Sequence, residues 1–326
     1  MTRLGLIGAG DHSRGQHGPA LKHLAAADGD VDLAAVCDLD RARAERCAAE
    51  FGFARVYTDS CAMLDGESLD GLIAVTPIEA TRAVAGALLT TGIPLLVEKP
   101  PGADSAEAGE LLEIARAHDA PHMVSFNRRF APGVTRARQW LEDRAMGRPV
   151  ELAVARLFRV ARRDADFVTG TAIHAVDTVL SLMPPAEAVA GRRWQTPVGA
   201  GGEPGQGCEG RVEFVGGSTA LFAIAPACGA HEETVELIGP EYVVRIDLAR
   251  GGVVVRDRGE TVLGYEEPPD APDWVRNGTL AETEAFVAAV RGEGPLGPTL
   301  ADGLIALRVA EAMDAGGNGP RAREAE

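Results

Sequence analysis

The chain has 326 residues, 46% of them hydrophobic and 25% charged, which suits a globular protein of two ordinary domains. Its formal net charge of −16 disfavours nucleic acid as a partner, because an acidic surface repels phosphate backbones. No apolar run reaches membrane-spanning length, and "MTRLGLIGAG" leads straight into a predicted strand, so we expect a cytoplasmic protein without a signal peptide or membrane contact.

Apolar runs alternate with amphipathic stretches through the first part of the chain. Strands are predicted at 3–9, 31–38, 69–77 and 93–101, with a short one at 55–57, and helices at 41–52, 80–92 and 105–119. Continuously apolar strands between amphipathic helices indicate a parallel sheet that is covered on both faces. Residues 1–122 are therefore predicted to form a doubly wound, Rossmann-type α/β domain that binds a dinucleotide.

The pattern changes after residue 123. Strand-like runs follow at 149–162, 210–226, 233–249 and 251–265, and tight turns such as Gly216-Gly217 join them. With few helices between these runs, residues 123–316 are predicted to form an α+β domain with an open, largely antiparallel sheet for substrate binding and oligomerisation. Two final helices, at 280–292 and 299–316, would end the fold and could pack back on the first domain. Residues 197–210 are predicted to be a mobile loop, and 317–326 a frayed tail.

The five cysteines form no C-x-x-C pair and have no zinc-ligand spacing, so no metal site is predicted.

The segment "GAGDHS" after the first strand begins like a dinucleotide-binding turn. Gly8 and Gly10 form its G-x-G, while Ser13 stands where a third glycine is expected. Such glycines let the backbone approach a pyrophosphate, and the start of the next helix offers it free N–H groups. The Ser13 hydroxyl could bond to phosphate, and so could His12 or Arg14, although these two could equally be solvated loop residues. The alternative for the whole segment is an ordinary βα turn.

An acid ends the second predicted strand, Asp38, 28 residues after Gly10. A carboxylate at this position accepts hydrogen bonds from both hydroxyls of the adenosine ribose and repels a 2′-phosphate. Asp38 therefore predicts NAD as the preferred cofactor and disfavours NADP.

The segment "LLVEKPPGADSAEAGELLEIARAHDAPHMVSFNRRFAP" (95–132) resembles the Gfo/Idh/MocA oxidoreductases, the family of glucose–fructose oxidoreductase and inositol dehydrogenase. Its most specific mark is E-K-P at 98–100. "TGTAIHAVDTVLSLMP" (169–184) is similar to the helix that carries the family's active-site histidine, and the resemblance covers almost the full length. It implies an NAD(P)-dependent dehydrogenase that transfers a hydride between the nicotinamide and a secondary alcohol or ketone of a sugar, cyclitol or sugar derivative.

The resemblance gives catalytic roles to Lys99 and His174, which would handle the hydroxyl proton. Lys99 follows a buried run at the carboxyl end of a predicted strand, where ligands bind in parallel sheets. Asp177 shares a helix face with His174 and could fix its tautomer. Without the resemblance, Lys99 would be a surface lysine before a Pro-Pro turn and His174 a core histidine. The Lys99–Pro100 bond is expected to be cis.

Binding roles are assigned to further residues. The cofactor is expected to contact Thr76, Pro77, Glu98, Lys99 and Asn127, besides the residues of the glycine turn and Asp38. The substrate is expected to contact Lys99, Arg128, Arg156, Gly170 and His174. Glu98 could instead be a structural carboxylate, and Asn127 and Arg128 could serve the contact between domains.

Gly170 departs from the resemblance, because many family members carry an aspartate four residues before the histidine. We expect the glycine to admit a bulkier or negatively charged ligand. Two alternatives stay open: a non-catalytic NAD-binding regulator or pseudoenzyme, and a reductase of a non-sugar substrate. The resemblance also implies a homodimer or homotetramer, formed through the free face of the antiparallel sheet.

Overall fold

The computed structural model describes residues 1–145, 147–160, 167–198 and 204–316. The chain divides into two compact units. The first unit comprises Met1–Asn127 and Pro272–Leu304, and the second comprises Arg128–Ala271 and Ile305–Glu326. The predicted tail at 317–326 and residues 199–203 of the predicted loop lie outside the described residues.

The first unit is built on a six-stranded parallel sheet with the strand order β3-β2-β1-β4-β5-β6. The strands are β1 Thr2–Ile7, β2 Val31–Cys37, β3 Arg55–Tyr57, β4 Gly71–Ala74, β5 Leu95–Glu98 and β6 His122–Ser125. The order reverses at β1 and β4, and ligands bind beyond the carboxyl ends of the strands at such a point. The predicted Rossmann-type sheet is therefore confirmed.

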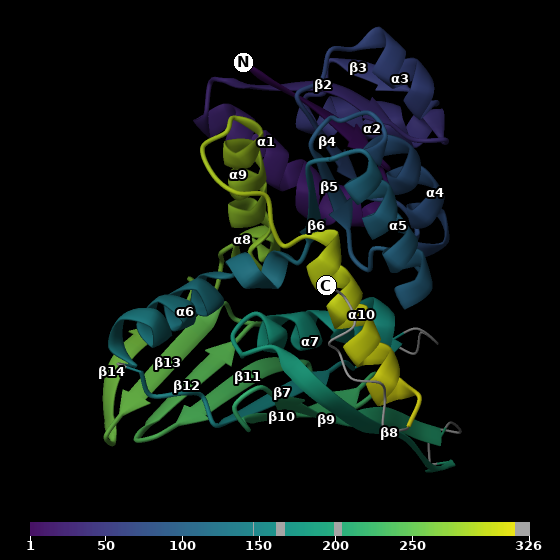
Figure 1. The fold of residues 1–326 in the computed structure, drawn as a ribbon. Helices are drawn as coiled ribbons and strands as arrows, with labels where there is room; N and C mark the ends of the chain where they lie inside the picture. The colour runs from purple at the N-terminus through teal and green to yellow at the C-terminus, as the bar shows by residue number, and fades with distance from the viewer. Residues whose placement is uncertain (146, 161–166, 199–203, 317–326) are drawn as a thin grey trace. The chain divides into compact units, whose positions relative to one another are not determined.

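Helices cover this sheet on both faces. They are α1 Gly18–Ala27, α2 Arg41–Phe51, α3 Ser60–Gly66, α4 Ile78–Leu89, α5 Ser105–Ala117, α8 Asp273–Arg276 and α9 Thr279–Val290. Helix α1 packs against α9, and α4 packs against α5 (Figure 1). All residues of β4 and β5 are buried, which explains why their sequences are apolar apart from Glu98, the last residue of β5.

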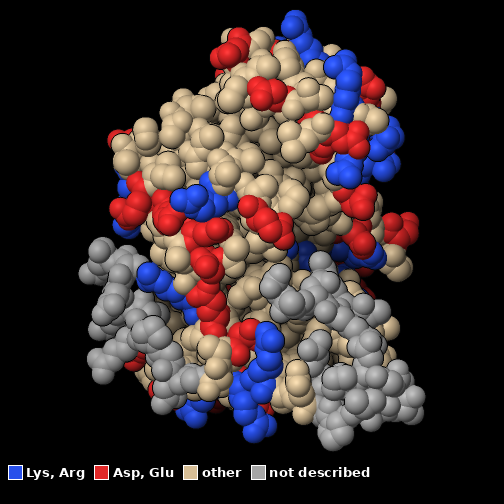
Figure 2. All heavy atoms as spheres, turned by 90° about the vertical axis from the view of Figure 1, so that its right-hand side faces the viewer, with Lys and Arg blue, Asp and Glu red and all other residues tan. Residues whose placement is uncertain are grey.

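Charged side chains of both signs are interleaved on the face shown in Figure 2. Arg82 of α4 pairs with Glu110 of α5, and Arg116 pairs with Glu113 at 3.0 Å. In the part of the chain that the structure describes, no helix combines the length and apolar character that a membrane crossing requires.

The second unit contains an eight-stranded sheet with the order β14-β13-β12-β11-β7-β10-β9-β8. The strands are β7 Leu152–Phe158, β8 Ala186–Val198, β9 Pro204–Phe214, β10 Thr219–Ala225, β11 Glu232–Gly239, β12 Tyr242–Asp247, β13 Gly252–Asp257 and β14 Glu260–Tyr265. Only β7 and β10 pair in parallel, so the predicted largely antiparallel sheet is confirmed. Gly216 and Gly217, both at positive φ, form the turn between β9 and β10.

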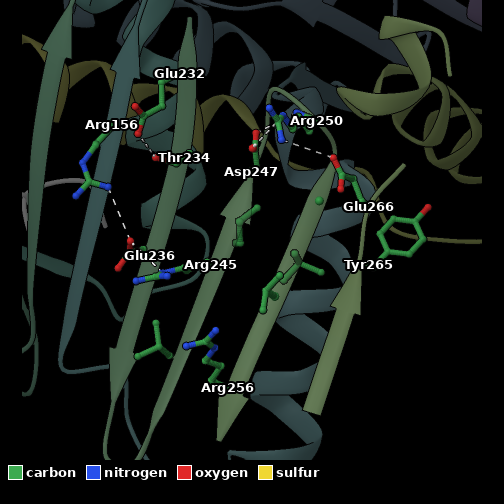
Figure 3. A pocket seen from close by; sticks show the side chains of 15 residues that line it. Arg156, Glu232, Thr234, Glu236, Arg245, Asp247, Arg250, Arg256, Tyr265 and Glu266 are labelled. Carbon is green, nitrogen blue, oxygen red and sulfur yellow. Dashed lines mark hydrogen bonds and ion pairs between the residues drawn. The ribbon is translucent and has the colours of Figure 1, made fainter. Parts of the chain in front are cut away.

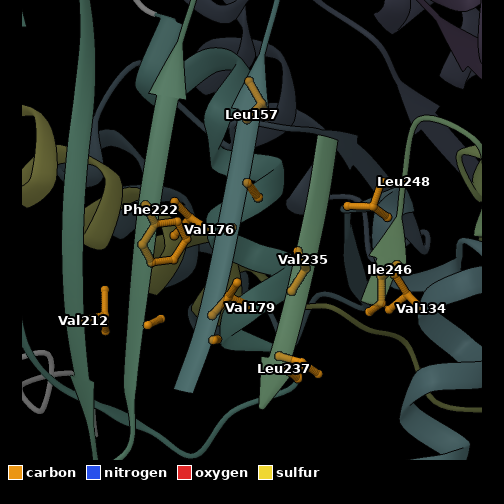
Figure 4. Close-up of a cluster of buried hydrophobic side chains, with 14 of the residues drawn as sticks. Val134, Leu157, Val176, Val179, Val212, Phe222, Val235, Leu237, Ile246 and Leu248 are labelled. Carbon is orange, nitrogen blue, oxygen red and sulfur yellow. The ribbon is translucent and has the colours of Figure 1, made fainter. Parts of the chain in front are cut away.

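One face of this sheet carries the hydrophobic core. Three helices accompany the sheet, α6 Pro132–Arg144, α7 Ile173–Leu180 and α10 Leu300–Asp314. Val176 and Val179 of α7 lie against Leu157, Phe222 and Val235 of the sheet (Figure 4). Burial of each such branched or aromatic side chain contributes about 1.5–3 kcal/mol. Alternate residues of β7 are buried, so one face of the strand packs in the core and the other face is partly exposed.

The prediction of a loop at 197–210 is wrong for residues 197–198, which end β8, and for residues 204–210, which belong to β9. The glycines there make room for large neighbours. A Cβ at Gly207 would lie 2.2 Å from the ring of Trp194, and one at Gly210 would lie 2.0 Å from the sulfur of Met313. These glycines therefore reflect close packing on the sheet and not a linker.

Candidate functional site

The two glycines of the first turn have different tasks. Gly8, at a φ of +93°, leaves no space for a side chain, because a Cβ there would lie 1.9 Å from the carbonyl oxygen of Val75. At Gly10 a Cβ would meet nothing within 4 Å. Gly8 thus lets the ends of β1 and β4 approach each other, while Gly10 leaves open space beside the turn for a ligand.

Ser13 fills the position of the missing third glycine. Its side chain is fully buried, and its hydroxyl donates to the carbonyl oxygen of Gly8 at 2.6 Å. A serine hydroxyl has a single hydrogen, so this bond leaves none to donate to a phosphate. The structure therefore gives Ser13 a role in closing the turn.

The segment that follows is a π-helix, Ser13–His17, which continues into α1. In a π-helix, residues five apart lie one above the other, whereas in an α-helix they point about 140° apart. His12 and His17 therefore reach the same partner. Nε2 of His12 lies 2.9 Å and Nε2 of His17 lies 2.8 Å from Oε1 of Glu98.

Glu98 is the last residue of β5 and is only 8% exposed. Burial alone would raise the pKa of its carboxyl group. The charges of His12 and His17 and their hydrogen bonds outweigh burial and hold this pKa well below its usual range. The ionised Glu98 is followed directly by Lys99, and the Lys99–Pro100 bond is cis, as expected.

Asp38 ties the end of β2 to the glycine turn. Its Oδ2 accepts a hydrogen bond from the backbone N–H of Ala9, and its Oδ1 accepts one from that of Asp40, each at 2.8 Å. A carboxylate has about four acceptor sites, so ribose hydroxyls can still bind. Leu39, which the sequence analysis missed, follows Asp38 with 94% of its surface exposed. Arg14 instead pairs with Glu50 of α2 at 2.8 Å.

The other predicted cofactor residues also follow strands of this sheet. Thr76 and Pro77 come after β4, and the hydroxyls of Thr76 and Thr81 lie 3.1 Å apart. Asn127, after β6, is buried and donates its side-chain amide to the Thr279 hydroxyl at 3.0 Å. Because the strands are parallel, their carboxyl ends meet at one edge, so this edge carries the glycine turn, Thr76, Glu98 and Asn127.

In the second unit, His174 lies on α7 and is 8% exposed. Gly170 lies just before it in a second π-helix, Phe167–Ala172. Asp177 is fully buried, and its two oxygens accept hydrogen bonds from the guanidinium of Arg129 at 2.9 and 2.7 Å. The carboxylate expected to orient His174 thus also holds an arginine.

Arg128 is held by a carboxylate that the sequence analysis missed. Its Nε donates to Glu233 at 2.8 Å, and Arg159 donates to the other oxygen of Glu233 at 2.7 Å. Burial would raise the pKa of Glu233, but Arg128 and Arg159, and more weakly the charge of His174, outweigh it and hold this pKa far below its usual range. Glu233 alternates with Val235 and Leu237 on the buried face of β11, and an acid in such an apolar row is a sequence signal for a buried ion pair.

Arg156 lies on the opposite face of the same sheet. It is 3.8 Å from Glu236 and lines a hollow of about 710 Å³ with Arg245, Arg256 and neighbouring residues (Figure 3). Its strand neighbours Ala155 and Leu157 face the core with α7. The sheet therefore lies between Arg156 and the helix that carries His174, and we leave Arg156 out of the proposed site.

Comparison with known proteins gives two family matches. The chain matches the model of the oxidoreductase family with an NAD-binding Rossmann fold over residues 2–126, and that of the family's C-terminal alpha/beta domain over residues 163–315.

The similar proteins with curated names include dehydrogenases of cyclitols and sugars at low identity. The rhizopine catabolism protein MocA of Rhizobium meliloti is 26% identical over 95% of this chain and 93% of its own. Inositol 2-dehydrogenase 2 of Saccharopolyspora erythraea is 31% identical over 55% of this chain and 51% of its own.

A solved structure shares the fold over almost the full length. Levoglucosan dehydrogenase in complex with NADH and levoglucosan has a TM-score of 0.82 at 17% identity, over 96% of both chains. With both of its parts matched by the family models, this chain belongs to the Gfo/Idh/MocA family of NAD-binding oxidoreductases.

Proposed function

We propose that this protein is an NAD-dependent dehydrogenase that acts on a secondary alcohol, or the matching ketone, of a sugar, cyclitol or sugar derivative. The observation that carries the proposal is the arrangement at the carboxyl edge of the parallel sheet. There Lys99 follows the ionised Glu98, and Glu98 is bonded to the two histidines of the glycine turn. Inositol 2-dehydrogenases among the similar proteins support the substrate class.

The residues present suit a dinucleotide. Gly10 leaves room beside the turn, and the Asp38 carboxylate keeps acceptor sites for ribose hydroxyls. The exposed side chain of Leu39 offers an apolar surface next to them, suited to an adenine ring. When bound, the nicotinamide supplies the hydride chemistry. The carboxylate of Asp38 disfavours the 2′-phosphate of NADP by charge repulsion.

Lys99 and His174 are proposed to move the hydroxyl proton. In the direction of alcohol oxidation, the O–H proton leaves the substrate as the hydride leaves its carbon, so a base must accept that proton. The neutral amine of a lysine can accept this proton, and so can an imidazole near neutral pH. Arg128 remains a candidate substrate residue, although Glu233 already binds its guanidinium.

The test of this assignment is Lys99→Ala. We expect kcat to fall by roughly 10²-fold or more, the scale of a lost acid–base group, with the Kd of NAD nearly unchanged. Lys22→Ala is the matched control, because Lys22 is exposed and bonds only to a backbone carbonyl among the contacts described. If Lys99→Ala keeps kcat within a factor of about two on a true substrate, Lys99 is not the proton carrier.

One alternative rests on Gly170, which supplies no carboxylate four residues before His174. Gly170 favours a regulator that binds NAD without turnover, and any measurable hydride transfer would eliminate this alternative.

We also propose a homodimer or homotetramer, because the uncovered sheet face exposes apolar side chains such as Leu221 and Val254. Light scattering on the purified protein tests the assembly, and a monomer would refute it.

A further inference from the structure

Three potential metal ligands converge beside the glycine turn. They are Nε2 of His12, Nε2 of His17 and a carboxylate oxygen of Glu98, and all lie within 4.8 Å of one another. We propose that in the dinucleotide-free protein these three side chains bind one divalent transition-metal ion of the zinc class. Two histidines and one carboxylate, with positions left for water, form a donor set that Zn²⁺ and Co²⁺ readily accept.

The π-helix creates this constellation. His12 and His17 are five residues apart, and only the wider turn of Ser13–His17 brings both imidazoles to the same oxygen. The ring centroids of the two histidines lie 5.6 Å apart. An α-helical turn would direct one of the rings away, so the ligand set depends on this local geometry.

The site combines fixed ligands with an open side. His17 is 1% exposed and Glu98 is 8% exposed, and each is held in a regular element. The His12 side chain is 51% exposed, and Cβ atoms at Gly10 and Gly15 would meet nothing within 4 Å. An ion and its waters can therefore enter from the side of His12 without displacing the core.

The present distances are close to what an ion needs. A tetrahedral zinc with bonds of about 2.0–2.1 Å holds its ligand atoms about 3.3 Å apart. The histidine nitrogens now lie 2.9 and 2.8 Å from the glutamate oxygen. Each distance must lengthen by about half an ångström. Rotation of the half-exposed His12 side chain can supply this for the first distance, and a small rotation of the Glu98 carboxylate can supply it for the second.

The tautomer change costs little at His17. The hydrogen bonds to Glu98 place a proton on Nε2, whereas a metal needs the lone pair there and moves the proton to Nδ1. Nδ1 of His17 is buried and has no hydrogen-bond partner among the described residues, so neither tautomer satisfies it. A ligand histidine without an acceptor for its second N–H binds about 10–100-fold more weakly. We therefore expect reversible occupancy that a chelator removes.

The test uses the full-length protein after chelator treatment, without dinucleotide or substrate, so it does not depend on the proposed dehydrogenase activity. Co²⁺ is titrated by its visible absorption and Zn²⁺ by calorimetry. We expect one ion per chain, and His12→Ala should weaken binding at least about tenfold. His118→Ala, which removes an exposed histidine at the end of α5, should leave the affinity unchanged.

A second variant guards against misfolding. Glu98→Gln keeps the size of the side chain and removes its charge, and it should weaken Co²⁺ binding with a melting transition still present. The proposal is overturned if the wild type shows no saturable binding at one ion per chain. It is also overturned if His12→Ala and His118→Ala bind alike. A sulfur-to-cobalt absorption band would assign the ion to a thiol such as the exposed Cys61 and would refute the site as well.

Discussion

Lys22 and Lys99 are the only lysines among the 32 residues of the chain that are lysine or arginine. An arginine keeps its proton at any physiological pH, whereas a lysine can release one when its surroundings favour the neutral form. Apart from Lys22, the chain uses arginine for its positive side chains, yet a lysine follows Glu98 directly. This choice of residue is compatible with the proton transfer that we propose for Lys99.

Lys99→Arg separates these two roles. The variant keeps the positive charge but cannot give up its proton, so we expect kcat to fall about as far as in Lys99→Ala. Lys22→Arg is the control and should retain the kcat of the wild type. Steady-state kinetics with a true substrate check the prediction, and recovery of kcat by Lys99→Arg would show that charge alone suffices.

Asp38→Asn tests the choice of cofactor. The wild type should bind NAD more tightly than NADP, because the Asp38 carboxylate repels a 2′-phosphate. Asparagine keeps the size and one acceptor oxygen but removes the charge, so the gap between the two Kd values should narrow. Titration by fluorescence or calorimetry measures both, and NADP binding as tight as NAD binding in the wild type would contradict the assignment.

Gly170→Asp tests which ligands can bind beside Gly170. Restoring a carboxylate four residues before His174 adds volume and negative charge, so it should lower kcat/KM for an acidic sugar and spare a neutral polyol. Arg156, one of the substrate contacts that the sequence predicts, lies on the other face of the sheet and would not pair with an acidic ligand near His174. The measurement is kcat/KM for matched acidic and neutral sugars, and an equal change for both would remove Gly170 from the specificity argument.

At the scale of elements, the π-helix Ser13–His17 decides how the first turn works. It inserts extra backbone into the start of α1, and it anchors the turn through Ser13, His17 and Gln16. Gln16 accepts a hydrogen bond from Asn277 in the segment before α9. The turn is therefore connected both to β5 and to the last part of the first unit.

Insertion of one alanine after Gly15 tests whether the spacing of the two histidines matters. His12 and His17 would then be six residues apart and would point about 120° apart on an α-helical turn, so both could no longer reach Glu98. We expect Co²⁺ affinity to drop at least about tenfold and the melting temperature to fall by a few degrees. Gly15→Ala keeps the length and meets nothing within 4 Å, so it should leave both unchanged or raise stability slightly. Unchanged metal binding in the insertion variant would show that the π-register is irrelevant.

The sequence predicted those elements whose pattern is local. Apolar strands such as β4 and β5 and the hairpin at Gly216-Gly217 were found because burial and turn geometry leave a direct trace. Strand β8 was missed because it is rich in small residues, and a Cβ at Gly191 would lie 2.4 Å from the backbone of Met313. Such packing depends on a distant helix, which periodicity cannot reveal.

The candidate site was predictable to a similar extent. Gly8, Gly10, Asp38, Glu98 and Lys99 follow from motifs at the ends of strands. The pairing of His12 with His17 does not, because nothing in the sequence pattern distinguishes the π-helix Ser13–His17 from an α-helical turn. Glu233 could have been found, since it interrupts an apolar face of β11.

At the scale of the whole molecule, each unit buries carboxylates among cationic or imidazole partners, Glu98 in the first unit and Glu233 and Asp177 in the second. The pKa values of Glu98 and Glu233 are lowered below the ordinary value of 4.5. The unfolded chain therefore takes up protons at a higher pH than the folded chain does. The stability that these groups contribute is fully present above the ordinary pKa and is lost as the pH falls through and below it.

Glu233→Gln tests this dependence on pH. We expect the wild type to lose free energy of unfolding steeply below a pH of about 4.5, and the variant to lose less, because it has no carboxylate to protonate there. At neutral pH the variant should be less stable by up to about 3 kcal/mol, since Arg128 and Arg159 keep their partly buried charges without their carboxylate partner. Urea unfolding at several pH values measures both, and an unchanged acid slope would contradict the role of Glu233.

We propose that this chain transfers a hydride between NAD and a polyol. The most direct measurement is the formation of NADH from NAD⁺ across a panel of inositols, neutral sugars and sugar acids, with NADP⁺ run in parallel. We expect turnover of at least one polyol, faster with NAD⁺ than with NADP⁺ and lost in Lys99→Ala. Tight binding of NAD⁺ by calorimetry, with no turnover of any compound in the panel, would contradict it and would favour a regulator that only binds the cofactor.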